Sequence, residues 1–271
     1  MAIPEFFKKI KRLKKDIDKL QPDAVHWDMA YLEKLKIDFT YTSNHLEGNR
    51  VSLGQTVQIL KEFVSPQNTS VADVLDIVNH KAVLDIVFED YNSQQLSESN
   101  IQKLHKELMK NPLQWGDEIH VAPGRYKILE NFTYREKGKL HTYALPADVP
   151  MEMSLLLQQT NSELANYDVD TVDLHPLSIA TRFHYVFLNK IHPFGDGNGR
   201  IARIFMNLIL LKTGFPPIFI SEVEKSKYMG TFSKEEKQPG AMLEFMAERL
   251  IESLKDKKKF LSMQKKNEKQ A

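Results

Sequence analysis

A short polar stretch between two strongly apolar segments constrains the fold of this chain more than any other feature. The stretch runs from His192 to Arg203 and is rich in glycine. Apolar residues occupy nearly every side of the segments at 183–191 and 204–211, which is typical of helices buried all round. We therefore predict a bundle of helices in which the polar stretch is a rigid loop pinned between two core helices, a good location for chemistry.

Helical periodicity recurs along most of the sequence. Apolar residues spaced three and four apart at the N-terminus predict an amphipathic helix that docks on the rest of the protein, with a lipid- or partner-binding helix as the alternative. A second helix is expected from about Trp27 to His45, ended by Glu47, Gly48 and Asn49. Further helices are predicted at 54–64, 71–91, 97–110, 150–165, 175–191, 200–213 and 240–257.

One region, between residues 125 and 145, departs from this helical pattern. Aromatic and aliphatic residues there flank a turn-like segment from Glu136 to Lys139, which predicts a single β-hairpin. Because an isolated two-stranded hairpin is marginal in water, this one must pack on the helical body, and its free edge is a candidate docking surface. The predicted fold class is all-α, a helical bundle with one β-hairpin.

Composition limits the classes of function. The 271 residues are 42% hydrophobic, enough for a sizeable core, and the absence of cysteine excludes disulfides, thiolate metal sites and a cysteine nucleophile. The 37 Lys and Arg nearly balance the 36 Asp and Glu, so no overall field draws the chain to nucleic acid. No uninterrupted apolar segment of the kind found in signal peptides or membrane spans is evident, and we expect a cytoplasmic protein without a membrane anchor.

The C-terminal end has a different composition from the rest. Lysines dominate the residues from Lys255 to Ala271, which predicts a helix end that frays into a solvated tail. We divide the chain into an N-terminal helical region at 1–110, a catalytic core at 111–250 and a basic tail at 251–271.

The polar stretch contains residue types suited to binding a polyphosphate. Gly197 and Gly199 allow the backbone to turn its N–H groups inward at the start of the next helix, where the helix dipole favours an anion. Asn198 can donate a hydrogen bond to a phosphate oxygen, and Arg200 and Arg203 lie three residues apart on one helical face. Two arginines indicate several phosphates.

Two further residues of the stretch supply a base and a metal ligand. Asp196 offers an oxygen suited to Mg²⁺ bound jointly by a carboxylate and the phosphates of a nucleotide, and His192 can accept a proton near neutral pH. Taken alone, a histidine before a proline is more often a capping or core residue, and a glycine-rich turn is more often only a turn. The joint occurrence of all these residues in one short loop favours the functional interpretation.

From His192 to Arg203 the sequence resembles the signature of the Fic family, H-x-F-x-[DE]-G-N-G-R-x-x-R, at every defined position. The resemblance extends to residues 123–127, similar to the segment that leads into the family's hairpin, and to residues 216–217 at the end of its core. Lys127 departs from the family pattern, because arginine is common at its position. In all, the similarity covers about residues 40–250.

The resemblance implies a protein adenylyltransferase that moves AMP from ATP to a Ser, Thr or Tyr hydroxyl of a target protein. His192 would be the general base for that hydroxyl, and Asp196 would hold Mg²⁺. A related subfamily, the phosphorylating toxins of the Doc type, carries lysine in place of Gly199, so the glycine found here favours nucleotidyl transfer.

The resemblance also assigns the phosphate contacts. Gly197, Asn198 and Gly199 would stabilise charge on the α-phosphate, as preorganised donors do, and Arg200 and Arg203 would grip the β- and γ-phosphates.

Two further features of the sequence resemble the family's contacts with the base and with the target. Tyr228 is similar to a family position near the adenine ring, and the hairpin at 126–145 would hold the unknown target segment by strand addition. His184 is set aside as a core histidine.

A second motif resembles the inhibitory motif of the family, [ST]-x-x-x-E-[GN], on a helix at about 27–48. It comprises Ser43, Glu47 and Gly48 and precedes the catalytic loop, as in the second Fic class. The resemblance implies that Glu47 pairs with Arg203 and so withholds that arginine from ATP. In some relatives the same glutamate also supports removal of AMP, which the sequence does not decide.

Two alternatives remain open at this point. One is a Fic enzyme that uses another nucleotide donor, and the other is a catalytically idle Fic-like protein with a binding or regulatory role. The sequence does not determine the target or the trigger that relieves inhibition. It also leaves the oligomeric state open, and a homo-oligomer is possible.

Overall fold

The computed structural model describes residues 4–21, 29–110, 122–135 and 138–268. It confirms the predicted fold class, with helices throughout and one two-stranded antiparallel sheet in the described chain. The predicted helix start at Trp27 and the predicted domain boundary at residue 111 lie outside the described residues. No helix within the described ranges is both long and apolar enough to cross a membrane.

The α-helices in chain order are α1 (Glu5–Leu20), α2 (Met29–Leu46), α3 (Leu53–Val57), α4 (Val71–Glu89), α5 (Glu98–Leu108), α6 (Val149–Ala165), α7 (Pro176–Tyr185), α8 (Asn198–Lys212), α9 (Lys225–Lys237) and α10 (Ala241–Glu268). In the described ranges the chain also forms two π-helices, η1 (Gln58–Glu62) and η3 (Val186–Ile191), and a 3₁₀ turn, η4 (Glu222–Glu224). The strands are β1 (Phe132–Tyr134) and β2 (Leu140–Thr142).

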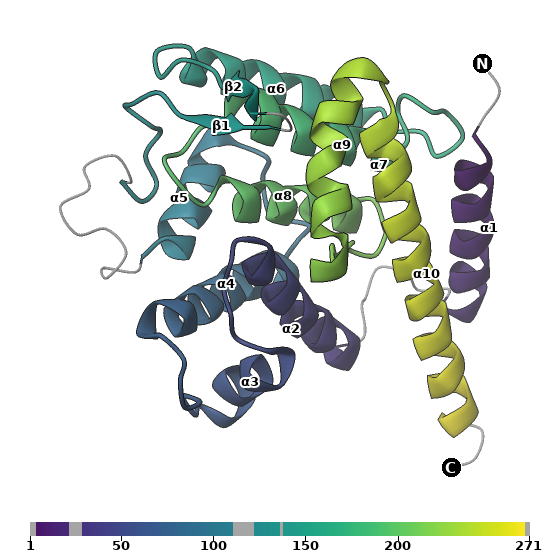
Figure 1. Ribbon diagram of the computed structural model, residues 1–271. Helices are drawn as coiled ribbons and strands as arrows, with labels where there is room; N and C mark the ends of the chain where they lie inside the picture. The colour runs from purple at the N-terminus through teal and green to yellow at the C-terminus, as the bar shows by residue number, and fades with distance from the viewer. Residues whose placement is uncertain (1–3, 22–28, 111–121, 136–137, 269–271) are drawn as a thin grey trace.

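Helix α8 is the central element. It crosses the middle of the molecule with α6 above it and α2 and α4 below it (Figure 1), and α7 packs along it. Every residue from Ile201 to Leu211 is buried, which confirms the prediction of a helix enclosed on all sides. The loop that enters α8 is therefore attached to the most enclosed element of the fold.

The helix predicted at 175–191 is present but changes type along its length. Helix α7 continues into the π-helix η3, which ends at His192 with a left-handed backbone, φ 49°. A π-helical turn carries one more residue than an α-helical turn, and such turns are frequent at functional sites. The polar loop therefore begins where the π-helix ends, at the left-handed backbone of His192.

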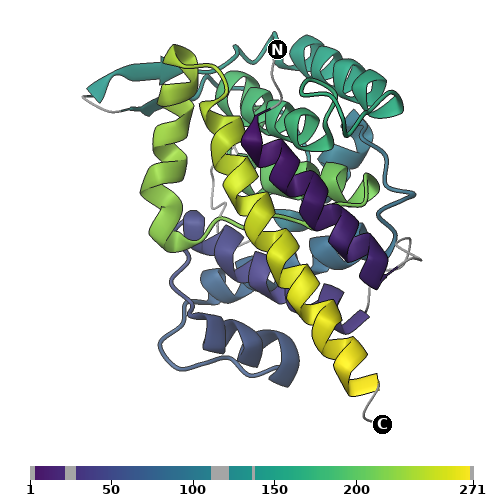
Figure 2. The same ribbon diagram turned by 90° about the vertical axis from the view of Figure 1, so that its right-hand side faces the viewer.

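The N-terminal helix α1 docks on the protein as predicted. Figure 2 shows it lying along α10, and the contacts between the two helices are extensive. Its apolar stripe faces this interface, and the stripe's buried residues are Phe7, Ile10, Leu13 and Ile17.

The predicted fraying after Lys255 is wrong, because α10 continues to Glu268. Its last part is held by neighbours distant in sequence: the rings of Phe260 and Tyr31 lie 4.7 Å apart, and Lys258 pairs with Asp16 at 2.6 Å. Leu261 is buried as well. A lysine-rich sequence is therefore helical here because α1 and α2 provide a surface for it, which the local pattern does not reveal.

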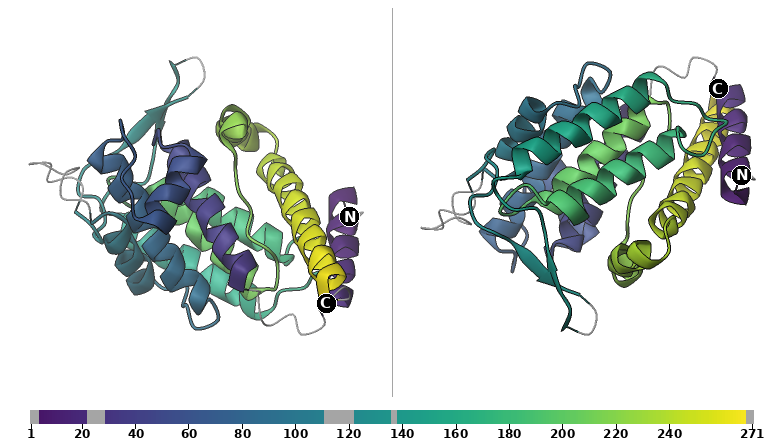
Figure 3. Two further views of the ribbon diagram at one scale, coloured as in Figure 1. Left: turned by 90° about the horizontal axis from the view of Figure 1, so that it is seen from below. Right: turned by 90° about the horizontal axis from the view of Figure 1, so that it is seen from above.

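The predicted hairpin is present, with Phe132 opposite Thr142 and Tyr134 opposite Leu140. Figure 3 shows that it extends beyond the helical body. Part of the predicted turn, residues 136–137, lies outside the described residues. The side chains of Phe132 and Tyr134 are 57% and 70% exposed, so the hairpin carries an apolar surface open to a partner.

Helix α9 is absent from the sequence prediction. Its residues are mostly polar, and Gly230 lies in its middle, so its intrinsic helical tendency is weak. Tyr228, Thr231 and Phe232 are buried at helical spacing against the core, and this tertiary packing decides its conformation.

Ile10→Ala should lower the free energy of unfolding by about 2–4 kcal/mol, because Ile10 is fully buried between α1 and α10 and its truncation leaves a cavity. Lys9→Ala, one residue away on the exposed face, should stay within about 0.5 kcal/mol of the native value. Urea denaturation measures both. Equal effects of the two substitutions would mean that α1 is not docked.

Candidate active site

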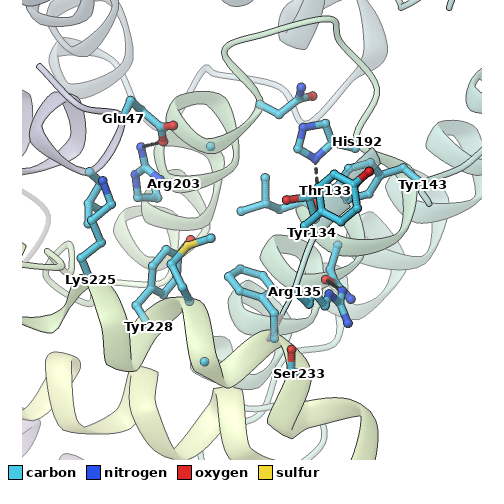
Figure 4. A pocket seen from close by; sticks show the side chains of 18 of the residues that line it. Glu47, Thr133, Tyr134, Arg135, Tyr143, His192, Arg203, Lys225, Tyr228 and Ser233 are labelled. Atoms are coloured by element: carbon cyan, nitrogen blue, oxygen red, sulfur yellow. Dashed lines mark hydrogen bonds and ion pairs between the residues drawn. The ribbon is translucent and has the colours of Figure 1, made fainter. Parts of the chain in front are cut away.

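The loop between η3 and α8 opens onto a cavity of about 450 Å³, a volume suited to a small-molecule ligand. Figure 4 shows the cavity surrounded by the end of α2, the hairpin, the loop and α9. Glu47 and Arg203 lie at one end, and His192 lies at the other with Tyr143 beside it. The cavity thus brings together residues that are far apart in the sequence.

His192 is arranged as a neutral base. Its Nδ1 lies 2.9 Å from the carbonyl oxygen of Leu188, and since a carbonyl only accepts, Nδ1 carries the hydrogen and Nε2 keeps a free lone pair. The ring stacks on Tyr143 with centroids 4.0 Å apart. Burial lowers the pKa of this imidazole to about 4, so the ring is unprotonated at neutral pH.

A sharp turn connects this histidine to helix α8. Gly197 adopts a left-handed conformation, φ 75°, immediately before the helix, as the sequence predicts. Its N–H donates a 2.6 Å hydrogen bond to Oδ1 of Asp196. The Asp196 side chain is 54% exposed and lines the cavity, and its Oδ2 lies 3.7 Å from Nη2 of Arg200.

Arg203 is buried and makes three hydrogen bonds to two residues at the end of α2 and just beyond it, Ser43 and Glu47. Its Nη2 lies 2.6 Å from Oε1 of Glu47 and 3.0 Å from the carbonyl oxygen of Ser43, and its Nε donates to the Ser43 hydroxyl at 3.0 Å. The predicted Glu47–Arg203 pair is therefore present. Burial tends to raise the pKa of Glu47, but the charge of Arg203 outweighs this effect and holds that pKa below its usual value.

Gly199 and Gly48 are glycines for different reasons. A Cβ atom on Gly199 would lie within 2.3 Å of the Glu47 carboxylate, so no side chain fits there while Glu47 holds Arg203. Gly48 has φ 98° and directly follows Glu47 beyond the end of α2, which is the predicted helix stop.

Two predicted phosphate contacts are engaged elsewhere. Arg200 does not line the cavity: its guanidinium pairs with Asp76 at 3.0 Å and is buried beside the sulfur of Met109. Asn198 lines the cavity, but its side-chain amide bonds the backbone N–H and C=O of Phe194, at 2.9 and 2.8 Å. In this geometry Asn198 bonds within the loop, Arg200 pairs with Asp76 and lies 3.7 Å from the Asp196 carboxylate, and the guanidinium of Arg200 does not reach the cavity.

Tyr228 lines the cavity from α9. Its hydroxyl lies 2.8 Å from Nε2 of His184 and also bonds Arg203. His184 is fully buried, as expected of a core histidine, and burial lowers its pKa to about 3. Tyr228 thus connects the core to the arginine of the ion pair.

Comparison with known proteins shows which family this part of the chain resembles. The sequence model of the Fic/DOC family matches residues 95–210, which include the whole loop from His192 to Arg203. Over these residues the chain is similar to the Fic/DOC family. Among the solved structures it resembles, a Fic domain containing signalling protein from Bacteroides thetaiotaomicron has a TM-score of 0.82 at 27% identity, covering 94% of this chain and 97% of that one. Fic-1 from C. elegans shares the fold, with a TM-score of 0.73 at 20% identity over 94% of this chain and 73% of that one.

Curated relatives carry the name Protein adenylyltransferase Fic. The one from Drosophila erecta is 28% identical over 214 residues, covering 76% of this chain and 39% of that protein. The one from Nematostella vectensis is 28% identical over 190 residues, covering 69% of this chain and 40% of that protein. The chain thus spans about two-fifths of the length of these relatives.

The Fic loop has a support that the sequence analysis missed, His105 on α5. Its ring stacks almost parallel on Phe194, 3.7 Å between centroids. Its Nε2 donates to the carbonyl oxygen of Asp196 at 3.0 Å, and its Nδ1 accepts from the N–H of Gly124 at 2.9 Å. A histidine on the apolar face of a helix is the only sequence signal, and it does not distinguish this role from ordinary core packing.

Buried histidines should make the protein acid-sensitive. Burial lowers the pKa of His105 and His192 to about 4, from an ordinary value of 6.5 that applies in the unfolded chain. The unfolded state therefore binds more protons below pH 6.5, so the free energy of unfolding should fall as pH drops from about 6.5 towards 4. Urea denaturation against pH measures the slope.

His105→Gln, which retains a donor for Asp196, should give a shallower slope between about pH 6 and 5. Carboxylates with lowered pKa values lose their stabilising effect only at more acidic pH and do not interfere in this range. Unchanged stability of the native chain across this range would contradict the neutral, buried state of these imidazoles.

Proposed function

We propose that this chain transfers AMP from ATP to a Ser, Thr or Tyr hydroxyl of a target protein and that Glu47 restrains this activity. The observation that carries the proposal is one cavity with an unprotonated His192 at one end and the Glu47–Arg203 pair at the other. The curated relatives named protein adenylyltransferase support the same reaction.

In the proposed reaction, Nε2 of His192 removes the proton of the target hydroxyl as its oxygen bonds to the α-phosphorus of ATP. The bond from that phosphorus to the oxygen bridging to the β-phosphate breaks, and pyrophosphate leaves. Backbone N–H groups at the start of α8 would stabilise the charge on the α-phosphate, and Arg203, once released, would bind the terminal phosphate.

Asp196 is the residue that would hold Mg²⁺. Among the described residues no group of three or more acidic or histidine side chains could enclose a metal, so an ion here must share its ligands with phosphates and water. That arrangement suits Mg²⁺, and the exposed carboxylate beside the loop fits it. When bound, the ion would offset negative charge on the phosphates.

The hairpin is the proposed docking site of the target. Thr133, Tyr134 and Tyr143 line the cavity, so a segment paired with the hairpin would pass close to His192. Main-chain pairing selects the extended shape of a segment more than its sequence, which suits several target classes.

The inhibitory segment precedes the catalytic loop, as in the second Fic class. The Glu47 carboxylate contacts the guanidinium of Arg203 at 2.6 Å, where the terminal phosphate of ATP would bind in the proposed reaction. The ion pair would have to open before ATP binds productively. A glutamate that never moved would give an idle binding protein, and the variants below separate these two functions.

Glu47→Gly should raise AMP incorporation from labelled ATP by roughly 5- to 150-fold, the usual range for coupling between sites. Glu47→Gln keeps the size of the side chain but removes its charge, so it should give a smaller increase. Labelled ATP, UTP and GTP compared with the same protein and lysate identify the donor. If Glu47→Gly labels neither itself nor lysate proteins above the native level, inhibition by Glu47 is refuted.

His192→Ala in the Glu47→Gly background should reduce the rate of AMP transfer by about 10²–10⁴-fold, the typical contribution of a general base. Its ATP affinity should stay close to that of the parent, because Arg203 and the helix start are untouched. Calorimetry measures the affinity. Transfer that survives this substitution would exclude His192 as the base.

A further inference from the structure

Lys127 is a buried cation close to the catalytic loop. Only 4% of its surface is exposed, and its Nζ donates to Oδ1 of Asn131 at 2.6 Å and to the carbonyl oxygen of Ile191 at 3.1 Å. Both acceptors are neutral, and the structure gives this described side chain no ion pair with a carboxylate. Burial lowers the pKa of Lys127 to about 8, so keeping the cation here has a cost in free energy.

Lys127 and Asn131 together bind the backbone on both sides of His192. The backbone N–H of Lys127 donates to the carbonyl oxygen of Pro193 at 2.9 Å, and Nδ2 of Asn131 donates to that of Phe194 at 3.1 Å. The bond to Ile191 holds a carbonyl group that the end of η3 leaves without a helical partner, and the other two bonds hold carbonyl groups of the loop beyond it. These bonds fix the left-handed backbone of His192, which is unfavourable for a residue with a side chain.

The same two residues are part of the base of the hairpin. Asn131 directly precedes β1, and Tyr143 directly follows β2. The Tyr143 ring stacks on His192 and has the Lys127 ammonium 5.8 Å from its centroid. The next residue, Ala144, donates its N–H to the carbonyl oxygen of Lys190 at 2.9 Å. Both ends of the hairpin are thus attached to the segment that carries the imidazole.

We propose that Lys127 and Asn131 are positioning residues that fix the orientation of His192 and couple it to the hairpin on which a target would dock. This inference rests on the proposed function and extends it. It gives a role to Lys127, a position where the sequence departs from the family pattern, and it predicts that substitution of either residue lowers turnover with little effect on nucleotide binding.

The charge of Lys127 adds an electrostatic effect to the geometric one. Among the described residues, Lys127, Glu47 and Asp196 carry charges that shift the pKa of the His192 imidazole, and the phenol ring of Tyr143 stacks on it. The cation disfavours the protonated ring, whereas the two carboxylates favour it. Loss of the ammonium should therefore raise the pKa of His192, and the acid limb of the activity profile should move to higher pH.

The kinetic experiment compares Lys127→Met, Lys127→Arg and Asn131→Asp in the Glu47→Gly background. Lys127→Met should lower kcat for AMP incorporation by roughly 10–100-fold, as expected for a small misplacement of a reacting group, with the KM for ATP changed by about twofold at most. Lys127→Arg keeps the cation and should restore most of the rate. Asn131→Asp keeps the acceptor for Lys127 but loses the donor to Phe194, so it should also lower kcat.

Lys103→Met, on the exposed side of α5, is the matched control and should leave kcat unchanged. A purely structural role for Lys127 would raise KM and lower kcat together and would leave the acid limb in place, which would overturn the proposal. Full activity of Lys127→Met would also overturn the proposal. If Lys127→Met does not fold, as judged by circular dichroism, the Asn131→Asp and Lys127→Arg results decide the outcome.

A second measurement does not depend on activity. NMR titration of the His192 imidazole in the nucleotide-free chain with its native Glu47 should give a higher pKa in Lys127→Met than in the unsubstituted chain or in Lys103→Met. An unchanged pKa would refute the electrostatic part of the proposal. Because this test needs no AMP transfer, its failure is distinguishable from failure of the proposed adenylyltransferase function.

Discussion

The ion pair between Glu47 and Arg203 organises the site. It joins the end of α2 to the first turns of the central helix, and the Ser43 contacts make Arg203 a buried part of this junction. A buried guanidinium needs a partner of opposite charge, since desolvation would otherwise penalise it heavily. In the proposed reaction a terminal phosphate and the glutamate are alternative partners for the same arginine. Competition between the phosphate and the glutamate for Arg203 is a simple physical basis for inhibition of the proposed reaction.

At the other end of the cavity, the position of His192 depends on a rigid backbone more than on ion pairs. The π-helix, the left-handed His192 and the turn at Gly197 are each locally unfavourable or unusual, and each is held by bonds from elements distant in sequence. His105 binds the carbonyl of Asp196, and Lys127 binds those of Ile191 and Pro193. A general base benefits from such support because proton transfer requires close alignment of the reacting groups.

Much of the fold and of the site was predictable from local patterns, and the errors have identifiable causes. The spacing of apolar residues located most helices and the hairpin, because burial of one face is encoded in the period of the sequence. It failed for α9 and for the end of α10, where a polar segment is helical only because a distant surface covers it. Arg200 was assigned to a phosphate from its position on the helix, yet Asp76 on α4 turns its guanidinium away from the cavity.

By itself, the sequence determined the helical class and the presence of a polar, glycine-rich loop between two buried helices, because these depend on residue types at short, regular spacings. The pairing of Glu47 with Arg203 was expected only from the resemblance to the Fic family. The tertiary structure decided which loop residues face the cavity and that His192 carries its hydrogen on Nδ1. It also decided that Lys127 and His105 bind carbonyl groups of the segment around His192. These properties depend on contacts between residues far apart in the chain. Burial and hydrogen-bond partners of this kind form only when the helices pack, so no local pattern records them.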